Sequence, residues 1–163
     1  LPGAFDGFEI AARELLGTDL LGVLTEELGE TFDTGIAPLY RLAMTPYRVA
    51  EAGSFMTRMG VPARRAEALA VVAEAIAEGM LQLEPGADLP STLEALVRIP
   101  GVGARSATAI VMRALHWPDA FSATDPALQR AVGVRGTRAL RRMSERWRPW
   151  RSYAAEHLRE GNA

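Results

Sequence analysis

The feature that most constrains this chain is a short glycine turn, Pro100-Gly101-Val102-Gly103, between two runs of apolar residues at helical spacing. Proline ends the first run, and the second run begins directly after the turn. Glycine permits the positive φ that a tight turn needs, and Val102 is free to pack inward. The pattern predicts a helix-hairpin-helix unit over about 91–115.

The second helix of this unit offers a place for an anion. Amides in the first turn of a helix have no partner within the helix, and Gly103 has no side chain to hold a phosphate away. A phosphate of a nucleic-acid backbone fits such a corner. The alternative is a corner kept only for packing, because a glycine pair alone is a weak signal.

The remaining sequence shows helical periodicity and no strand pattern, so we expect an all-α protein whose 163 residues (1–163) form one helical domain. Ser91 is expected to cap the first hairpin helix, with Val97 on its apolar face. In the last helix we expect Trp150, Tyr153 and Leu158 to face inward. The other helices are expected at 8–16, 20–28, 46–52, 55–59 and 62–78, then from Pro126, after Gly136 and from Pro149.

Composition excludes several kinds of chemistry. The chain has no cysteine, which excludes disulfides, thiol catalysis and cysteine-ligated iron–sulfur clusters. His116 and His157 are the only histidines, too few to indicate a zinc site. Lysine is also absent, so no side chain supplies the neutral amine of a Schiff base. No apolar run approaches the roughly 20 residues of a membrane span.

Charge is divided unevenly along the chain. Residues 1–97 hold 6 arginines and 15 acidic residues, a net charge of −9, whereas 98–163 hold 12 arginines and 5 acidic residues, a net charge of +7. The C-terminal part is therefore the candidate surface for a polyanion. The alternative is that arginines between Arg138 and Arg151 solvate helices and pair with the acidic part.

Asp125 is the candidate catalytic residue. An aspartate followed by proline is a good helix cap, and capping alone explains the pair locally. A carboxylate held at that helix start, beside the hairpin, would also stabilise positive charge on a deoxyribose whose glycosidic bond breaks. It would orient or deprotonate the attacking water as well. Both interpretations use the same geometry.

Motifs in order along the chain resemble the helix-hairpin-helix DNA glycosylases, in particular the 3-methyladenine DNA glycosylase II branch. The quoted matches are LPGAFDGFE at 1–9, RRAEAL at 64–69, the hairpin followed by Asp125, PDAF at 118–121 and RWRPWRSYA at 146–154. The resemblance implies a multi-helix orthogonal bundle in which Asp125 is catalytic. It implies that the hairpin binds DNA through Pro100, Gly101, Val102, Gly103, Ala104, Arg105 and Ser106.

The resemblance also marks where this chain departs from the branch. The branch places aromatic rings in its base pocket at positions that here are Arg105, Ala109 and Arg159, so the pocket is altered. The segment that carries an apolar wedge is about one helical turn shorter, leaving Leu20 and Leu21 as wedge candidates, with core packing as their alternative. No cofactor is required, although the resemblance implies a Na⁺ or K⁺ ion on the backbone carbonyls of Val97, Ile99 and Gly101.

These observations favour a monofunctional DNA glycosylase of base excision repair that removes a damaged, alkylated base and has no lyase activity. The alternatives are a catalytically impaired module that binds DNA or senses damage, and a purely structural helical domain. We expect a monomer that acts on double-stranded DNA in the bacterial cytoplasm, at the nucleoid when bound, with no membrane partner. The β-rich N-terminal domain usual in this branch has no counterpart here, so we expect the domain to be part of a longer protein.

Overall fold

A computed structural model describes residues 6–37 and 39–161, so Leu1 to Phe5 of the LPGAFDGFE motif lie outside the described residues. The described part is helical, and its β-type pairing is confined to one isolated bridge between Thr31 and Arg41. The helices are α1 (Gly7–Leu16), α2 (Thr18–Leu28), α3 (Pro46–Ala52), α4 (Phe55–Arg58), α5 (Ala63–Ala77), α6 (Leu89–Arg98), α7 (Ala104–Ala114), α8 (Pro126–Ala131), α9 (Thr137–Ser144) and α10 (Arg151–Glu160), with a 3₁₀ turn at Glu145–Trp147.

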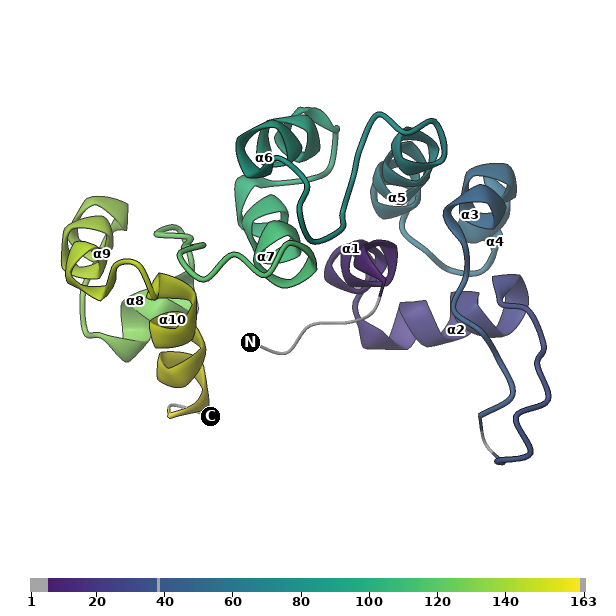
Figure 1. Cartoon of the computed structure of the whole chain (residues 1–163), viewed down its shortest axis with the longest axis horizontal. Helices are drawn as coiled ribbons and strands as arrows, with labels where there is room; N and C mark the ends of the chain where they lie inside the picture. The colour runs from purple at the N-terminus through teal and green to yellow at the C-terminus, as the bar shows by residue number, and fades with distance from the viewer. Residues whose placement is uncertain (1–5, 38, 162–163) are drawn as a thin grey trace.

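This architecture confirms the predicted all-α class. In Figure 1, α1, α5, α6 and α7 are viewed nearly end on, α2 lies across the view, and α8, α9 and α10 form one end of the molecule. Within the described ranges, no helix combines the length and the apolar character that crossing a bilayer requires.

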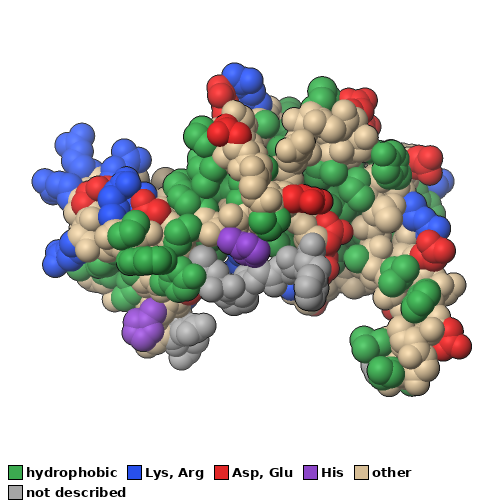
Figure 2. Space-filling model, in the orientation of Figure 1, with side chains coloured by type: hydrophobic (Ala, Val, Ile, Leu, Met, Phe, Trp, Pro, Cys, Tyr) green, Lys and Arg blue, Asp and Glu red, His purple; other side chains and the backbone are tan. Residues whose placement is uncertain are grey.

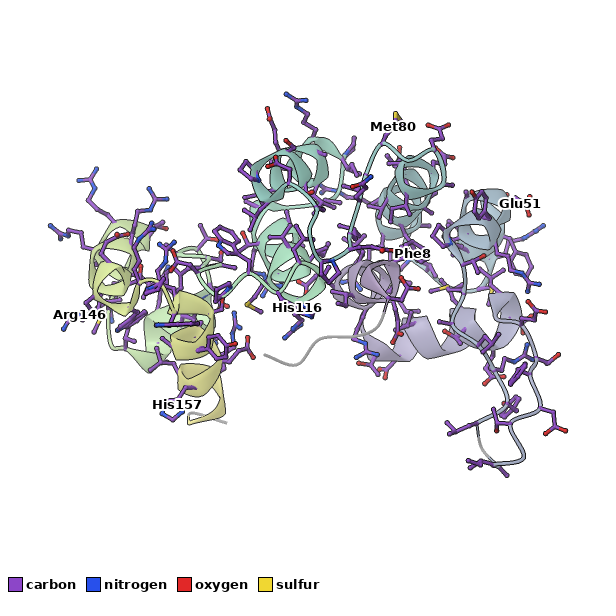
Figure 3. All side chains as sticks on the ribbon, in the orientation of Figure 1. Phe8, Glu51, Met80, His116, Arg146 and His157 are labelled. Atoms are coloured by element: carbon purple, nitrogen blue, oxygen red, sulfur yellow. The ribbon has the colours of Figure 1, made fainter. Side chains whose placement is uncertain are left out.

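The larger core is built around α1, which packs against α2, α5 and α7. Phe8 of α1 is 2% exposed and is directed among the neighbouring helices (Figure 3). Helix α5 also packs against α3, and α6 packs against α7. The hairpin formed by α6 and α7 therefore stands on a rigid base, since α7 and the turn contact two other helices.

Helix α6 begins earlier than the sequence pattern suggested. Its cap is Asp88, whose carboxylate accepts a hydrogen bond from the Ser91 amide at 3.0 Å. The prediction of a cap at Ser91 was wrong because α6 already begins at Leu89, and the residue that caps it is Asp88. Val97 was also misplaced, since its side chain is 47% exposed while Leu96 is fully buried.

A smaller core joins α8, α9 and α10 through Leu128, Leu140 and Ala155. Leu158 packs against it, as expected, but Trp150 and Tyr153 are 58% and 48% exposed, so the inward prediction for them was wrong. Helix α10 begins at Arg151 rather than at Pro149. The buried face of α10 carries Ser152 and Ala155. The rings of Trp150 and Tyr153 lie on the surface, where they pack edge to face.

Two of the motifs bind each other and connect the two cores. Arg151, from RWRPWRSYA, makes a bidentate pair with the Asp119 carboxylate of PDAF at 2.7 and 2.8 Å. The buried Ser152 hydroxyl donates to the carbonyls of Trp117 and Ala120. Trp147 packs edge to face on Phe121, with ring centroids 5.8 Å apart. These contacts fix the segment that leads from α7 to α8 against α10.

Candidate functional site

The hairpin turn is pressed against α5 on one side. Gly101 has a φ of +93°, and a Cβ there would lie 2.9 Å from the Cβ of Ala68 and 3.2 Å from the Arg64 carbonyl oxygen. Val102 is 5% exposed, which confirms the prediction that it packs inward. The turn therefore has a packing role, and glycine at position 101 is required by both backbone conformation and close contact.

The other side of the turn is open. Gly103 has an ordinary φ of −78°, and nothing lies within 4 Å of a Cβ built on it. It is the N-cap of α7 and provides no side-chain cap, unlike the residues that cap α1, α3, α6 and α8. The exposed first-turn amides of α7, those of Ala104, Arg105 and Ser106, are thus free to meet an anion.

The backbone carbonyls before and within the turn suit an oxygen-liganded cation in part. The Val102 amide donates to the Ile99 carbonyl at 3.0 Å. Among the described backbone amides, none donates to the carbonyls of Val97 or Gly101. Carbonyl oxygens are ligands that hard cations accept, and this set retains lone pairs for one.

A cavity of about 220 Å³ lies between the larger and the smaller core. It is lined by Asp125 and by all three residues named as base-pocket candidates, Arg105, Ala109 and Arg159. These residues come from α7, from the start of α8 and from α10, so they meet only in the folded chain. The lining residues are Glu14, Arg105, Thr108, Ala109, Met112, Arg113, Ala120, Phe121, Ser122, Asp125, Ala127, Leu128, Ala155 and Arg159.

Asp125 is both a cap and a pocket residue. One carboxylate oxygen accepts the Ala127 amide at 2.8 Å, and the other accepts the Arg159 guanidinium at 2.7 Å. The side chain is only 4% exposed. Burial alone would raise the pKa of Asp125, but the hydrogen bonds from Arg159 and the Ala127 amide outweigh it, and the pKa is lowered from its usual value. The group is therefore a carboxylate at neutral pH.

Arg159 belongs to a chain of ion pairs along one wall of the cavity. Its guanidinium contacts Glu156 as well as Asp125, and Glu156 also lies 4.0 Å from Arg113. At this position, where the resemblance leads us to expect a ring, Arg159 provides a charge that two carboxylates largely compensate. Arg105 is exposed, and within the described ranges it forms no salt bridge with a carboxylate.

Sequence reasoning missed Glu14, Arg113 and Phe121, which also line the cavity. A signal for Glu14 was present, because it lies three and four residues after Ala11 and Ile10 and so falls on the buried face of α1. A charged residue within an apolar stripe indicates that something other than core packing surrounds it. Arg113 and Phe121 carry no comparable signal.

The structure does not favour the proposed wedge residues. Leu21 is 8% exposed and belongs to the larger core, and Leu20 packs partly against the same core. A wedge must project into a DNA duplex. The assignment of Leu21 as a wedge is therefore corrected to core packing, because α2 begins at Thr18 and turns that residue toward α1.

A group of arginines lies on α9 and directly after it. Arg138, Arg141 and Arg142 share one exposed side of this helix, which contains no acidic residue. Figure 2 shows positive side chains gathered at this end of the molecule, and Arg146 extends outward there in Figure 3. Among the described residues, none of these four arginines makes a salt bridge.

Comparison with solved structures defines the class of fold. A 3-methyladenine DNA glycosylase from Archaeoglobus fulgidus superposes with a TM-score of 0.79 at 19% identity, covering 96% of this chain and 58% of that one. An 8-oxoguanine glycosylase/lyase from Clostridium acetobutylicum, solved with double-stranded DNA, gives 0.78 at 19% identity, covering 97% and 61%. The described helices therefore have the fold of the helix-hairpin-helix DNA glycosylases.

Sequence comparison then finds a homologue of this chain. DNA-3-methyladenine glycosylase 2 of Escherichia coli is 32% identical over 167 residues, which cover 97% of this chain. No family model matches the chain. The chain is homologous to DNA-3-methyladenine glycosylase 2, and it spans 58% of the length of that relative.

Proposed function

We propose that this chain is the helical domain of a monofunctional DNA glycosylase that hydrolyses the N-glycosidic bond of a damaged base. The observation that carries the proposal is Asp125, a buried carboxylate at the edge of a cavity that α7 of the hairpin also lines. Homology to a 3-methyladenine DNA glycosylase supports alkylated bases as the class of damage.

The proposed mechanism begins with DNA held by backbone atoms. The open amides at the start of α7 bind a phosphate, and Arg105 is close enough in sequence to add charge there. A nucleotide rotated out of the duplex places its base in the 220 Å³ cavity. A base is smaller than a drug-sized ligand, so this volume, below the roughly 300 Å³ of typical ligand pockets, is suitable.

Asp125 then acts on the sugar. Its carboxylate stabilises the positive charge that develops on the deoxyribose as the glycosidic bond breaks. It also orients the water that attacks the anomeric carbon, which leaves an abasic site. Because no lysine is present, the side chains provide no amine for a covalent link to the sugar, and we propose hydrolysis without lyase activity.

Two further features fit the DNA interface of this proposal. A Na⁺ or K⁺ ion on the carbonyls of Val97, Ile99 and Gly101 would add positive charge beside the bound phosphate. The exposed arginines of α9 would contact phosphates farther along the duplex. Replacing Arg138, Arg141 and Arg142 by glutamine should then reduce the slope of log affinity against log salt by up to about 2.7, from about 0.9 for each lost contact.

Release of bases from DNA tests the proposal directly. Wild type and Asp125→Asn are incubated with duplexes that contain alkylated or deaminated bases, and free base is quantified. We expect Asp125→Asn to release base at least about 10³-fold more slowly, because it removes the charge that stabilises the transition state. Duplex affinity should remain unchanged. Equal release by the two proteins would refute the proposal and leave a DNA-binding module.

A further inference from the structure

A second carboxyl group lines the cavity. Glu14 projects from α1, is half-buried and has no function in the mechanism above. The groups that face it are Arg105, Ser106 and Arg113 from α7 and Arg159 from α10. The other charged residue that lines the cavity is Asp125, at the start of α8, and it is not among the groups that act on Glu14.

The two carboxyl groups have opposite environments. Both oxygens of Asp125 accept strong hydrogen bonds, which lowers its pKa despite burial. For Glu14, burial is the dominant influence and raises the pKa, even though the three arginines and a hydrogen bond with Ser106 oppose it. A pair of carboxyls whose pKa values are moved apart in one site is a common arrangement for an acid and a base.

The walls of the cavity lack the features that usually hold a cationic base. Three guanidinium groups line it, those of Arg105, Arg113 and Arg159. A cationic base is usually held on electron-rich rings, and Phe121 is the one aromatic residue among the lining residues. That ring is already occupied by Trp147 at its edge and by the guanidinium carbon of Arg151, 5.9 Å from its centroid. Guanidinium donors suit a neutral base rich in carbonyl and ring-nitrogen acceptors.

A neutral base needs help to leave. When the glycosidic bond breaks, its electron pair moves to the base, which then carries a negative charge unless it gains a proton. A cationic alkylated base accepts the same electron pair and leaves neutral. An enzyme whose pocket takes neutral bases therefore gains from a protonated group near the base, while an enzyme for cationic bases does not.

We propose that this pocket accepts neutral damaged bases and that Glu14 is the general acid that protonates the leaving base. The proposal rests on the glycosylase function proposed above and names its substrate class. The Glu14 proton passes to a ring nitrogen as the bond between that base and the anomeric carbon breaks. Water then adds to that carbon beside Asp125, and the proton that water loses returns through solvent to Glu14. The products are the free base and an abasic sugar.

The test compares two leaving groups in single-turnover reactions. Wild type, Glu14→Gln and the control Glu27→Gln are given duplexes that contain hypoxanthine, which is neutral, or 7-methylguanine, which is cationic. Glu27 is exposed on α2 and is not among the cavity residues. We expect Glu14→Gln to slow hypoxanthine release by about 100-fold or more and 7-methylguanine release by less than about 3-fold.

A pH profile distinguishes an acid from a structural residue. In wild type, hypoxanthine release should fall as pH rises through the pKa of Glu14, because the acid loses its proton. Glu14→Gln should lose that limb while its thermal unfolding stays close to wild type. A merely structural role would slow both bases together and keep the limb.

The outcomes separate this proposal from the glycosylase function itself. If wild type releases 7-methylguanine and not hypoxanthine, or if Glu14→Gln slows both equally or neither, the role of Glu14 is refuted while the glycosylase function stands. If wild type releases neither base and Asp125→Asn behaves identically on the whole panel, the glycosylase function fails, and the acid fails with it.

Discussion

The hairpin and the cavity represent two ways of building a site. The hairpin takes its chemistry from the backbone of one continuous segment, where amides and carbonyls do not depend on side-chain identity. The cavity takes its chemistry from side chains of α1, α7, α8 and α10 that are distant in sequence. The hairpin site keeps its backbone groups as long as its glycines are retained. The chemistry of the cavity, in contrast, changes with the substitution of any one of its side chains.

This difference fits the way in which the hairpin and the cavity of this chain compare with the glycosylase branch that its sequence resembles. The glycine turn is intact, and Asp125 still stands at the start of α8. Around it, Arg105, Ala109 and Arg159 stand on intact helices at positions where the sequence resemblance leads us to expect rings. The side chains that line the cavity can therefore diverge while the helical frame stays the same.

The largest effect is expected where a side-chain contact supports the cavity. Arg151→Met should lower the free energy of unfolding by about 2–3 kcal/mol, because it removes a nearly buried bidentate partner of Asp119. Arg148 bonds the same carboxylate but is 53% exposed, so Arg148→Met should cost less than about 1 kcal/mol. Urea unfolding measures both, and equal losses would contradict the importance of burial here.

The next effect concerns the packed side of the hairpin. Gly101→Ala should lower the free energy of unfolding by about 1–2 kcal/mol, since alanine is strained at positive φ and its Cβ would approach that of Ala68. Gly103→Ser is the control, because position 103 is open and serine is a good cap. The comparison fails if the two variants unfold at the same urea concentration.

The open side of the hairpin should affect DNA rather than stability. Gly103→Asp places a charge where a phosphate would bind, and we expect about tenfold weaker duplex affinity, or about 1.4 kcal/mol. Gly103→Asn has the same shape without the charge and serves as the control. Fluorescence anisotropy at fixed salt measures both. Identical affinities for the aspartate and asparagine variants would show that no phosphate is bound at this corner.

The smallest effect is electrostatic and lies in the cavity. Because the pKa of Asp125 is lowered in the folded state, its bond with Arg159 stabilises the protein above the unfolded pKa of the carboxyl. That stability is lost as pH falls through the folded pKa. Arg159→Met should therefore cost about 1 kcal/mol at neutral pH, a modest value because Arg159 is 34% exposed, and the cost should shrink below about pH 4.

Unfolding measured at pH 7 and in steps below pH 4 tests that expectation. Arg98→Met is a suitable control, since the Arg98–Glu94 pair is 75% and 65% exposed and should show little difference at any pH. A cost for Arg159→Met that is independent of pH would mean that its packing, and not its charge, supports the cavity.

Much of the fold was predictable because helical periodicity and glycine are local signals. The hairpin helices, the inward position of Val102 and the all-α class follow from spacing within a few residues. The predictions were wrong where another residue provided the helix cap, and where the orientation of a helix placed a side chain on the surface. Asp88 capped α6 before Ser91 did, and a later start of α10 turned Trp150 to the surface.

The cavity was predictable only in part. Asp125, Arg105 and Arg159 could be named from motif positions, and the structure brings them to one cavity. Their mutual contacts could not be predicted, because 34 residues separate Asp125 from Arg159 and no sequence spacing relates them. Glu14 is farther still, and the packing of α1 against α7 brings it to the same cavity.

By itself, the sequence determined the helices, the glycine corner and the absence of any lysine or cysteine chemistry, since these depend on residue type and local spacing. The tertiary structure decided which charges meet. Asp125 is bonded to Arg159, Glu14 lies beside three arginines, and Gly103 is open whereas Gly101 lies against α5. The physical reason is that backbone conformation is set within a few residues, whereas electrostatic environment depends on neighbours that only packing supplies.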